Sequence, residues 1–338
     1  MKTLRFAPFI LTALFFAGCK PSGSDGSGSG KKRIRFVSNG VVAFWTIAAA
    51  GVKAGGEKFG VDAETLMPVE GISDQKRIIE DLLTQGVDGI SVSPIDPVNQ
   101  TELLNSAAAR TKLITNDSDA PASNRLVYIG MDNYKAGRLC GELVREAMPG
   151  GGTIMLFIGR LEQDNAKRRR QGCIDGMLGR PADPKRYDPP SEIIDEAGFK
   201  IVGTLTDNFD RAKVKANVED TLSKYPEIAG MVGLFAYNPP IILEVLSQAG
   251  RLDKVKVIAF DEDDATLDGI RKGHVHATVV QNPYMYGFKS VEVLAELAKG
   301  NNGVIPAGKM IDIPARQIRQ ADVDVFEAEL KKQMGTAK

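Results

Sequence analysis

The chain has 338 residues, of which 43% are hydrophobic and 25% are charged; this composition is typical of globular proteins, and the length favours two domains over one. Its 43 basic residues equal its 43 acidic residues, so no basic excess exists to attract nucleic acid. Three cysteines without a CxxC spacing argue against a disulfide framework and against a zinc site. His274 and His276, two apart on an expected strand, indicate a structural role and no metal site.

The first residues have the features of a secretion signal. Lys2 and Arg5 precede an apolar stretch, residues 6–16, that is too short to span a bilayer as a mature helix. The next residues, Phe-Ala-Gly-Cys ending at Cys19, resemble a bacterial lipoprotein signal in which the cysteine is lipidated. The phenylalanine departs from the usual aliphatic residue, so ordinary secretion is the alternative. We expect a signal peptide over residues 1–18 and a lipid anchor on Cys19, outside the cytoplasmic membrane in the periplasm or cell envelope.

A regular alternation of elements begins after residues 19–32, which are rich in glycine and serine and have the composition of a flexible tether. Apolar runs predict strands at residues 34–39, 66–69, 87–94 and 112–117. Amphipathic patterns predict helices between them at residues 46–59, 73–85 and 98–110. Strands separated by helical patterns of about ten to fifteen residues indicate a parallel, doubly wound sheet.

The same alternation starts again near residue 134. Strands are expected at residues 153–159, 199–205, 228–237 and 255–260, and helices at 134–148, 166–178, 214–222, 241–249 and 265–272. Residues 180–191, rich in proline and aspartate, read as a surface loop. Two successive series of similar size predict two similar α/β lobes, and the cleft between them is the expected binding site.

The strand at residues 255–260 ends abruptly in four acidic residues, 261–264. In open α/β sheets the ligand crevice lies outside the carboxyl ends of the strands, so Asp261 is the first candidate for ligand contact. The remaining acids, Glu262 to Asp264, have another explanation. They can open the next helix, because negative charge is favourable at a helix N-terminus.

Seven short signatures stand in order along the chain. They are Phe44-Trp45, Asn116-Asp117, the residues from Asn165 to Gly172, Asn208-Phe209-Asp210-Arg211, Tyr237-Asn238, Ala259-Phe260-Asp261 and Val280-Gln281-Asn282-Pro283. With these signatures, the chain from about residue 33 onward resembles the type I periplasmic sugar-binding proteins of the ribose-binding kind. These proteins are the substrate-capturing components of ABC transporters.

The resemblance implies a particular division into lobes. Two doubly wound lobes would be joined by three hinge strands that cross near Met131, Gln281 and Asp312. The N-terminal lobe would contain residues 33–131 and 282–311, and the C-terminal lobe residues 132–281 and 312–338.

The resemblance also implies the ligand contacts. Phe44 and Trp45 would cover a sugar from the first lobe and Phe209 from the second. Asp117, Asn238, Asp261 and Gln281 would contact its hydroxyl groups. Flat aromatic rings suit the C–H faces of a sugar, and amides, carboxylates and cationic groups suit its rim. The position of Trp45 in a polar segment after a strand favours a ligand over a core role, whereas Phe44 and Phe209 could also be buried packing residues.

Three positions depart from the ribose-binding pattern. Ser118 and Lys167 stand where that family carries arginines, and Val42 stands where it carries an asparagine. Arg169 lies in the same helical turn as Lys167 and could substitute for it, so both are candidate contacts, although residues 167–170 could also form a solvated helix face. We therefore expect a small polar carbohydrate other than ribose. An anionic or carboxylated sugar would suit the surplus positive charge.

The expected mechanism is capture by hinge closure, after which the closed monomer presents its lobes to a membrane permease. It needs no covalent chemistry, cofactor or metal. A repressor of the lactose type would need an N-terminal helix-turn-helix in place of the signal and tether. An enzyme is disfavoured because the chain has no GxSxG, no P-loop, no GxGxxG after a strand, and no histidine near an expected strand end. A binding module for chemotaxis or signalling remains an open alternative, as does pairing of Cys140 with Cys173.

Overall fold

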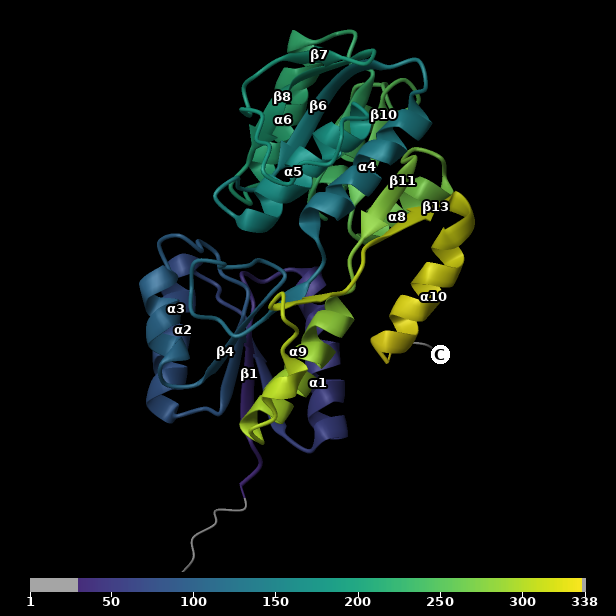
Figure 1. The fold of residues 1–338 in the computed structure, drawn as a ribbon. Helices are drawn as coiled ribbons and strands as arrows, with labels where there is room; N and C mark the ends of the chain where they lie inside the picture. The colour runs from purple at the N-terminus through teal and green to yellow at the C-terminus, as the bar shows by residue number, and fades with distance from the viewer. Residues whose placement is uncertain (1–29, 336–338) are drawn as a thin grey trace, which may run out of the picture. The chain divides into compact units, whose positions relative to one another are not determined.

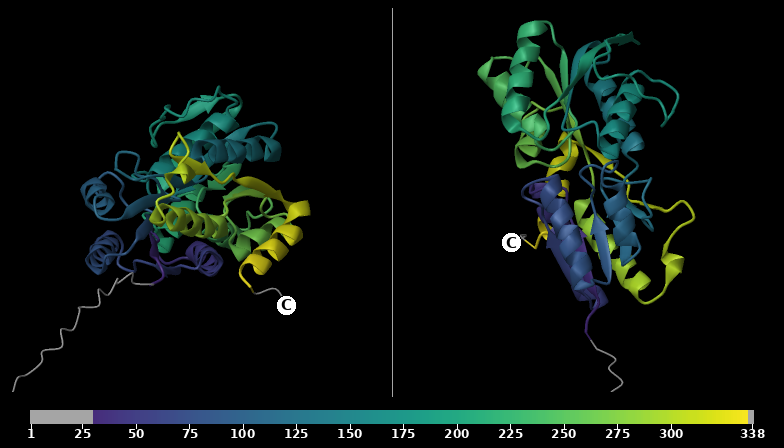
Figure 2. Two further views of the ribbon diagram at one scale, coloured as in Figure 1. Left: turned by 60° about the horizontal axis from the view of Figure 1, so that its bottom comes forward. Right: turned by 90° about the vertical axis from the view of Figure 1, so that its left-hand side faces the viewer.

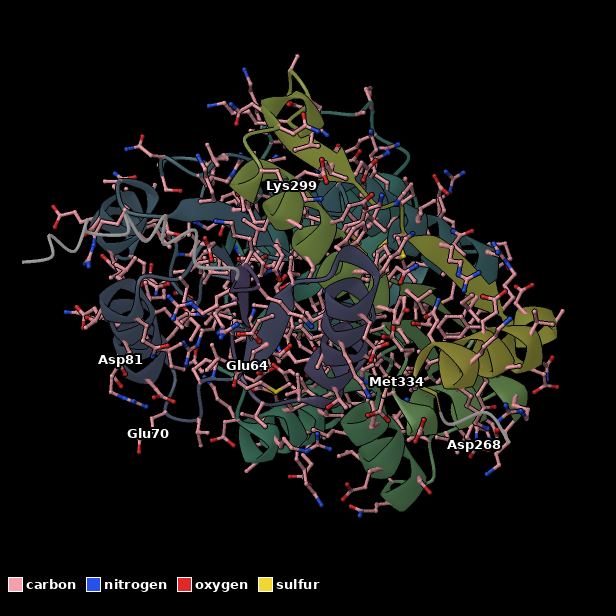
Figure 3. The ribbon with its side chains drawn as sticks, turned by 90° about the horizontal axis from the view of Figure 1, so that it is seen from below. Glu64, Glu70, Asp81, Asp268, Lys299 and Met334 are labelled. Atoms are coloured by element: carbon pink, nitrogen blue, oxygen red, sulfur yellow. The ribbon has the colours of Figure 1, made fainter. Side chains whose placement is uncertain are left out.

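The structure is a computed structural model that describes residues 30–335. The expected signal peptide, Cys19 and most of the tether lie outside the described residues. Residues 31–335 belong to one compact unit, in which two α/β lobes are visible (Figures 1 and 2). The exposed acidic residues Glu70 and Asp81 lie at the edge of the molecule when it is seen from below (Figure 3).

The first lobe contains a fully parallel sheet. Its strand order is β12-β5-β4-β3-β1-β2, with β1 (Arg33–Val37), β2 (Asp62–Leu66), β3 (Gly89–Val92), β4 (Lys112–Asn116), β5 (Tyr128–Gly130) and β12 (Met310–Asp312). Helices α1 (Ala43–Phe59) and α9 (Pro283–Ala298) pack on one face of this sheet. Helices α2 (Ile72–Gln85) and α3 (Thr101–Ala108) pack on the other. The apolar stripes expected from the sequence therefore become two cores, one on each face.

The second lobe contains a mixed sheet with antiparallel edges. Its order is β13-β11-β10-β9-β6-β8-β7, with β6 (Gly152–Ile158), β7 (Ile194–Glu196), β8 (Phe199–Thr206), β9 (Gly230–Gly233), β10 (Lys256–Phe260), β11 (Ala277–Val280) and β13 (Arg316–Arg319). Only β7 and β13 pair antiparallel among these strands. One face is covered by α4 (Asn133–Ala147) and α5 (Asp164–Met177), and the other by α6 (Arg211–Lys224), α7 (Asn238–Gln248), α8 (Asp264–Arg271) and α10 (Val323–Gln333).

Within residues 30–335, the chain passes between the two sheets three times. It leaves β5 for α4, leaves β11 for α9, and runs from β12 to β13. Short 3-10 turns at Asn302–Val304 and Gln320–Asp322 complete the described elements. The two-lobed α/β architecture is the one that the alternation of strands and helices predicted, and the three connections are those that the resemblance implied.

Local details differ from the sequence-based expectation. Helix α1 begins at Ala43 instead of residue 46, so Phe44 and Trp45 lie in its first turn, where the Trp45 amide donates to the Val42 carbonyl (2.9 Å). Asp263 caps α8 through the amide of Ala265 (2.9 Å), as the helix-opening alternative for these acids expected. Cys140 and Cys173 are both buried and free.

Within residues 30–335, no helix has the length and apolar character needed to cross a membrane. The same part of the chain has no cluster of three or more His, Cys, Asp or Glu side chains that could hold a metal ion.

Candidate ligand-binding site

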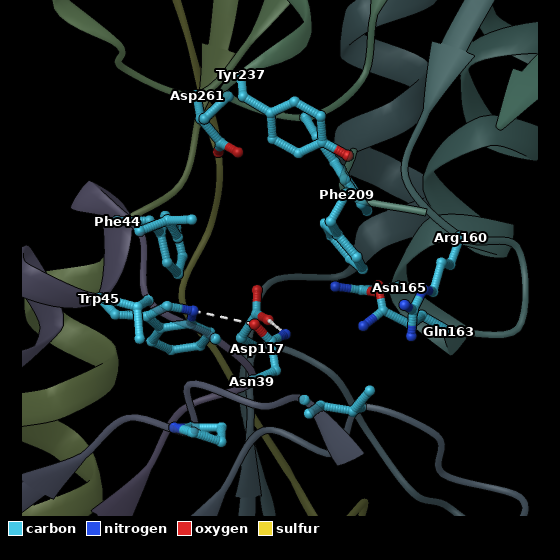
Figure 4. A pocket seen from close by; sticks show the side chains of 18 of the residues that line it. Asn39, Phe44, Trp45, Asp117, Arg160, Gln163, Asn165, Phe209, Tyr237 and Asp261 are labelled. Carbon is cyan, nitrogen blue, oxygen red and sulfur yellow. Dashed lines mark hydrogen bonds between the residues drawn. The ribbon is translucent and has the colours of Figure 1, made fainter. Parts of the chain in front are cut away.

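A cavity of about 400 Å³ lies where loops from both sheets meet (Figure 4). This volume is within the usual range for small-molecule sites. Polar, charged and aromatic side chains that suit a polar ligand line this cavity. They are Asn39, Phe44, Trp45, Asp117, Arg160, Gln163, Asn165, Arg169, Phe209, Phe235, Tyr237, Asp261 and Gln281.

On the first-lobe wall, a hydrogen-bond chain holds Asp117. The Trp45 indole Nε1 donates to Asn39 Oδ1 (3.0 Å), and Asn39 Nδ2 donates to Ser93 Oγ (3.1 Å). Ser93 Oγ in turn donates to Asp117 Oδ2 (3.0 Å). No described residue donates to the other oxygen, Asp117 Oδ1, so this atom is available to a ligand.

Trp45 packs in the hydrophobic core, whereas its position in the sequence favoured a role in ligand contact alone. Its side chain is only 2% exposed and belongs to the apolar cluster between the sheet and α1. The ring of Phe44 meets it edge-on, with centroids 4.9 Å apart and planes at 88°. Phe44 is partly buried, and both residues line the cavity, so the indole of Trp45 positions Asn39 and also borders the site.

On the second-lobe wall, Asp261 is the centre of a second network. Gln281 Nε2 donates to Asp261 Oδ1 (2.9 Å), and Tyr286 Oη donates to Gln281 Oε1 (3.1 Å). Arg169 Nη1 lies 4.0 Å from Asp261 Oδ2. The guanidinium group of Arg169 is 1% exposed and also donates to Asn133 Oδ1 and to the Leu234 carbonyl (2.8 Å).

Both carboxylates follow a strand and adopt a left-handed backbone. Asp117 comes directly after β4 with φ 53°, and Asp261 comes directly after β10 with φ 68°. Their amides still donate to the neighbouring strands, at Ile129 O (3.1 Å) and Val279 O (2.8 Å). Such a conformation costs about 1–3 kcal/mol and concentrates at functional sites. The turn directs each carboxylate into the cavity while the strand stays paired.

Burial shifts the acid–base behaviour of both groups. Loss of hydration raises the pKa of Asp117 to about 6, although Arg169 and the Ser93 hydrogen bond oppose the shift. The pKa of Asp261 is raised for the same reason and opposed by Arg169. Hydroxyl groups that donate to these carboxylates would stabilise the charged forms.

Phe209 presents an exposed ring to the cavity. It is 41% exposed and stacks on Phe235, with centroids 5.8 Å apart and planes at 11°. The guanidinium carbon of Arg160 lies 5.2 Å from its centroid. Asp207, which is buried, accepts from the Phe209 amide (2.8 Å) and from Tyr237 Oη (2.5 Å), and so fixes this loop. The exposure of Phe209 does not fit the alternative that it is a buried packing residue.

Two candidate contacts do not reach the cavity. Lys167 is exposed on α5, because a helical residue two positions from Arg169 points to another face. Asn238 is fully buried, where Nδ2 donates to Asp207 Oδ2 (3.0 Å) and Oδ1 accepts from the Phe235 amide (3.1 Å). Asn238 thus supports the loop that carries Tyr237.

Other lining residues were not singled out as contacts from the sequence. They are Asn39, Arg160, Gln163, Asn165, Phe235 and Tyr237. Their positions in the sequence could have indicated four of them. Asn39 and Arg160 follow the strands β1 and β6, and Asn165 and Tyr237 belong to two of the seven signatures. Val42, one of the three departures from the ribose-binding pattern, lines the cavity, whereas Ser118 is buried.

Two α/β lobes that close a polar and aromatic cavity between their strand ends define a two-lobed solute-binding protein. Residues 36–302 match the family model described as periplasmic binding protein domain, and the chain belongs to this family. It is therefore an extracytoplasmic binding protein and not an enzyme.

Individual relatives cover most of the chain. The ribose import binding protein of Bacillus subtilis is 24% identical over 303 residues, which are 88% of this chain and 92% of the relative. The D-ribose/D-allose-binding protein of Pseudomonas aeruginosa is 24% identical over 73% of this chain and 74% of its own length.

Solved structures show the same fold. A solute-binding protein of an ABC transporter from Burkholderia graminis, in complex with D-arabinose, has a TM-score of 0.76 and 27% identity, and the match covers 87% of this chain and 96% of that one. A glucose-galactose binding protein from Geobacillus stearothermophilus has a TM-score of 0.76 and 27% identity over 86% and 98% of the two chains.

Proposed function

We propose that this protein captures a monosaccharide between its two lobes and delivers it to the permease of an ABC transporter. The observation that carries the proposal is the convergence of carboxylates and aromatic rings from both sheets on one cavity. The relatives named for ribose and the structure with D-arabinose support a sugar as the ligand.

We assign the contacts by chemistry. Asp117 Oδ1 and the carboxylate of Asp261 would accept hydrogen bonds from sugar hydroxyls, and Arg169 would donate to a hydroxyl or ring oxygen. Phe44 and Phe209 would cover the C–H faces of the sugar. Gln281 would orient Asp261, because their hydrogen bond is already formed.

The proposed mechanism is ligand-driven closure. Each wall of the cavity supplies only part of the contacts, so the sugar favours the arrangement in which both walls reach it. The closed monomer then offers surfaces of both lobes to the permease. We include in this proposal the division into lobes given above, in which the first lobe ends at residue 131, the second lobe ends its first segment at residue 281, and the chain leaves the first lobe again at residue 311.

We also propose that residues 1–18 are a signal peptide and that Cys19 carries a lipid anchor. The apolar stretch, the cysteine after small residues and the glycine- and serine-rich tether support this part of the proposal.

Calorimetric titration of the chain from residue 20 onward tests the function. The panel would contain D-ribose, D-arabinose, D-allose, D-glucose and D-galactose, with the Trp45 fluorescence as a second readout. At least one sugar is expected to bind saturably, and Asp261→Asn should weaken it at least tenfold, because charge-assisted hydrogen bonds are lost. Asparagine tolerates the left-handed backbone at this position.

The matched control is Asp253→Asn, which removes an exposed carboxylate away from the cavity and should leave the affinity unchanged. If no sugar of the panel or its acidic derivatives binds, while an amino acid or a nucleoside does, the sugar assignment is wrong.

A further inference from the structure

One part of the cavity wall offers hydrogen-bond donors without partners. Gln163 is only 1% exposed and lines the cavity, yet its Nε2 has no hydrogen-bond partner among the described residues. A buried amide nitrogen without an acceptor costs free energy comparable to a lost hydrogen bond. An acceptor on a bound ligand would remove this cost.

Arg160, on the same wall, is half-buried and has no acidic partner among the described residues. No residue in the range 30–335 forms a hydrogen bond or an ion pair with its guanidinium group, whose recorded contact is the ring of Phe209 (5.2 Å). Arg169, by contrast, lies 4.0 Å from Asp261. The cavity therefore contains one arginine beside a carboxylate and one without an acidic partner.

Asn165 adds a third donor. Its Oδ1 accepts from the amide of Ala166 (2.8 Å), while its Nδ2 has no partner in the described part of the chain. Figure 4 shows Asn165 beside Gln163 and Arg160, on the side of the cavity opposite Trp45. The unpartnered nitrogens of these three side chains are thus donors, and Gln163 Oε1 is the one acceptor beside them to which no described residue donates a hydrogen bond.

The backbone at this wall reinforces the preference for negative charge. Gln163 and Asn165 flank the N-terminus of the 14-residue helix α5, which no side chain of the described residues caps. A helix N-terminus favours an anion. The one acid in this first turn, Asp164, is bound by Arg168 (2.8 Å) and so is already compensated.

We propose that Arg160, Gln163 and Asn165 form an anion subsite for the carboxylate of an acidic monosaccharide, a uronic or aldonic acid. A sugar hydroxyl both donates and accepts, whereas a carboxylate only accepts and so matches the guanidinium group of Arg160 and the amide nitrogens of Gln163 and Asn165. Asp117 and Asp261 remain at the other side to read hydroxyl groups. The inference rests on the proposed sugar-binding function and specifies its substrate class.

Calorimetry with matched neutral and acidic sugars tests the subsite on the chain from residue 20 onward. The pairs are D-glucose with D-glucuronate and D-galactose with D-galacturonate, and D-gluconate and D-glucose 6-phosphate are added. At least one acidic sugar should bind about tenfold or more tightly than its neutral partner. This ratio should shrink about tenfold in Arg160→Gln and stay the same in Arg145→Gln, which removes an exposed arginine outside the cavity.

A second variant addresses the buried amide. Gln163→Glu places a negative charge at the subsite, so the ratio of acidic to neutral affinity should fall below that of the unmodified protein. Thermal unfolding of the variant without ligand checks that it folds. In the unmodified protein, affinity for the acidic sugar should also fall with added salt, because screening weakens the charge interaction.

The outcomes separate this inference from the proposed function. Equal or tighter binding of the neutral sugars would overturn the anion subsite and leave sugar binding intact. An unchanged ratio in Arg160→Gln would also overturn it, and tighter binding of the phosphate ester than of any carboxylate would overturn the carboxylate assignment. If neither neutral nor acidic sugars bind, the proposed function fails as well.

Discussion

Asp117 shows how a single residue couples the fold to ligand binding. It is buried, it sits in a left-handed conformation at a strand end, and only one of its carboxylate oxygens is held by a described residue. Burial makes its charged form costly, and the raised pKa is the measure of that cost. The same burial places the free oxygen where the effective dielectric is lower than in water, so a hydrogen bond from a ligand is stronger there.

The raised pKa of Asp117 predicts a pH-dependent stability. The ordinary pKa of 3.8 is raised to about 6 in the folded protein, so the folded state holds a proton that the unfolded state releases. The contribution of Asp117 to the free energy of unfolding is therefore present below about pH 4 and is lost as the pH rises through about 6. Relative to Asp117→Asn, the unmodified protein should lose up to about 3 kcal/mol between these pH values.

Urea unfolding of both proteins at pH 4 and at pH 7 measures this difference. The difference between the unmodified protein and Asp117→Asn cancels the contribution of the other carboxylates, several of which have a lowered pKa in the folded protein. Asp253→Asn, at an exposed position, should differ from the unmodified protein by the same amount at both pH values. A difference for Asp117→Asn that does not change with pH would contradict the raised pKa.

At the scale of elements, both lobes use glycines to bring two helices together. A Cβ atom at Gly137 of α4 would lie 2.1 Å from the Arg169 carbonyl of α5, and one at Gly172 would lie 2.0 Å from the Tyr134 carbonyl. In the first lobe, a Cβ at Gly51 of α1 would lie 1.9 Å from the Tyr284 carbonyl of α9. The close contact of α4 with α5 matters for the site because α5 carries Arg169.

Gly137→Ala should therefore disturb stability and binding together. The added methyl group must push α4 from α5, and overpacking of this kind costs about 1–3 kcal/mol. Because the contact is at the Arg169 backbone, sugar affinity should also fall. Urea unfolding and calorimetry measure the two effects.

Gly150→Ala is the control for this pair of measurements. No atom of the described residues lies within 4 Å of the Cβ position at Gly150, and the backbone of Gly150 is not left-handed, so stability and affinity should be nearly unchanged. Full stability in Gly137→Ala would show that the helices move apart at no cost.

At the scale of the whole described unit, three connections join the two sheets and the cavity lies between their strand ends. The walls of the cavity are built by different lobes, so rotation about the three connections changes the distance between the walls and leaves each sheet intact. This property is the physical basis of the proposed closure.

Closure predicts a change in size on binding. Small-angle scattering of the protein with a saturating ligand, identified by the titrations above, should give a smaller radius of gyration than the protein alone. Asp261→Asn at the same ligand concentration should contract less, because fewer molecules carry ligand. An unchanged scattering curve at full occupancy would mean that the ligand binds without closure.

The alternation of apolar runs and helical stripes was sufficient to predict the two-lobed α/β fold. Periodicity is a local property, and it decides which face of each element is buried. The position of Asp117 and Asp261 at strand ends was readable for the same reason, since parallel strands place their carboxyl ends at one edge of the sheet.

Only the tertiary structure decided which side chains share the cavity. On α5, Arg169 turns inward and Lys167 outward, and this depends on how the helix packs against α4. The side-chain amide of Asn238 donates its hydrogen bond to Asp207, which lies 31 positions away in the sequence, and no local pattern reveals this partner. Likewise, the side-chain nitrogen of Gln163 is buried by tertiary packing at a place where no described residue offers it an acceptor. Sequence patterns report local periodicity, whereas hydrogen-bond partners and cavity walls are set by contacts between distant segments.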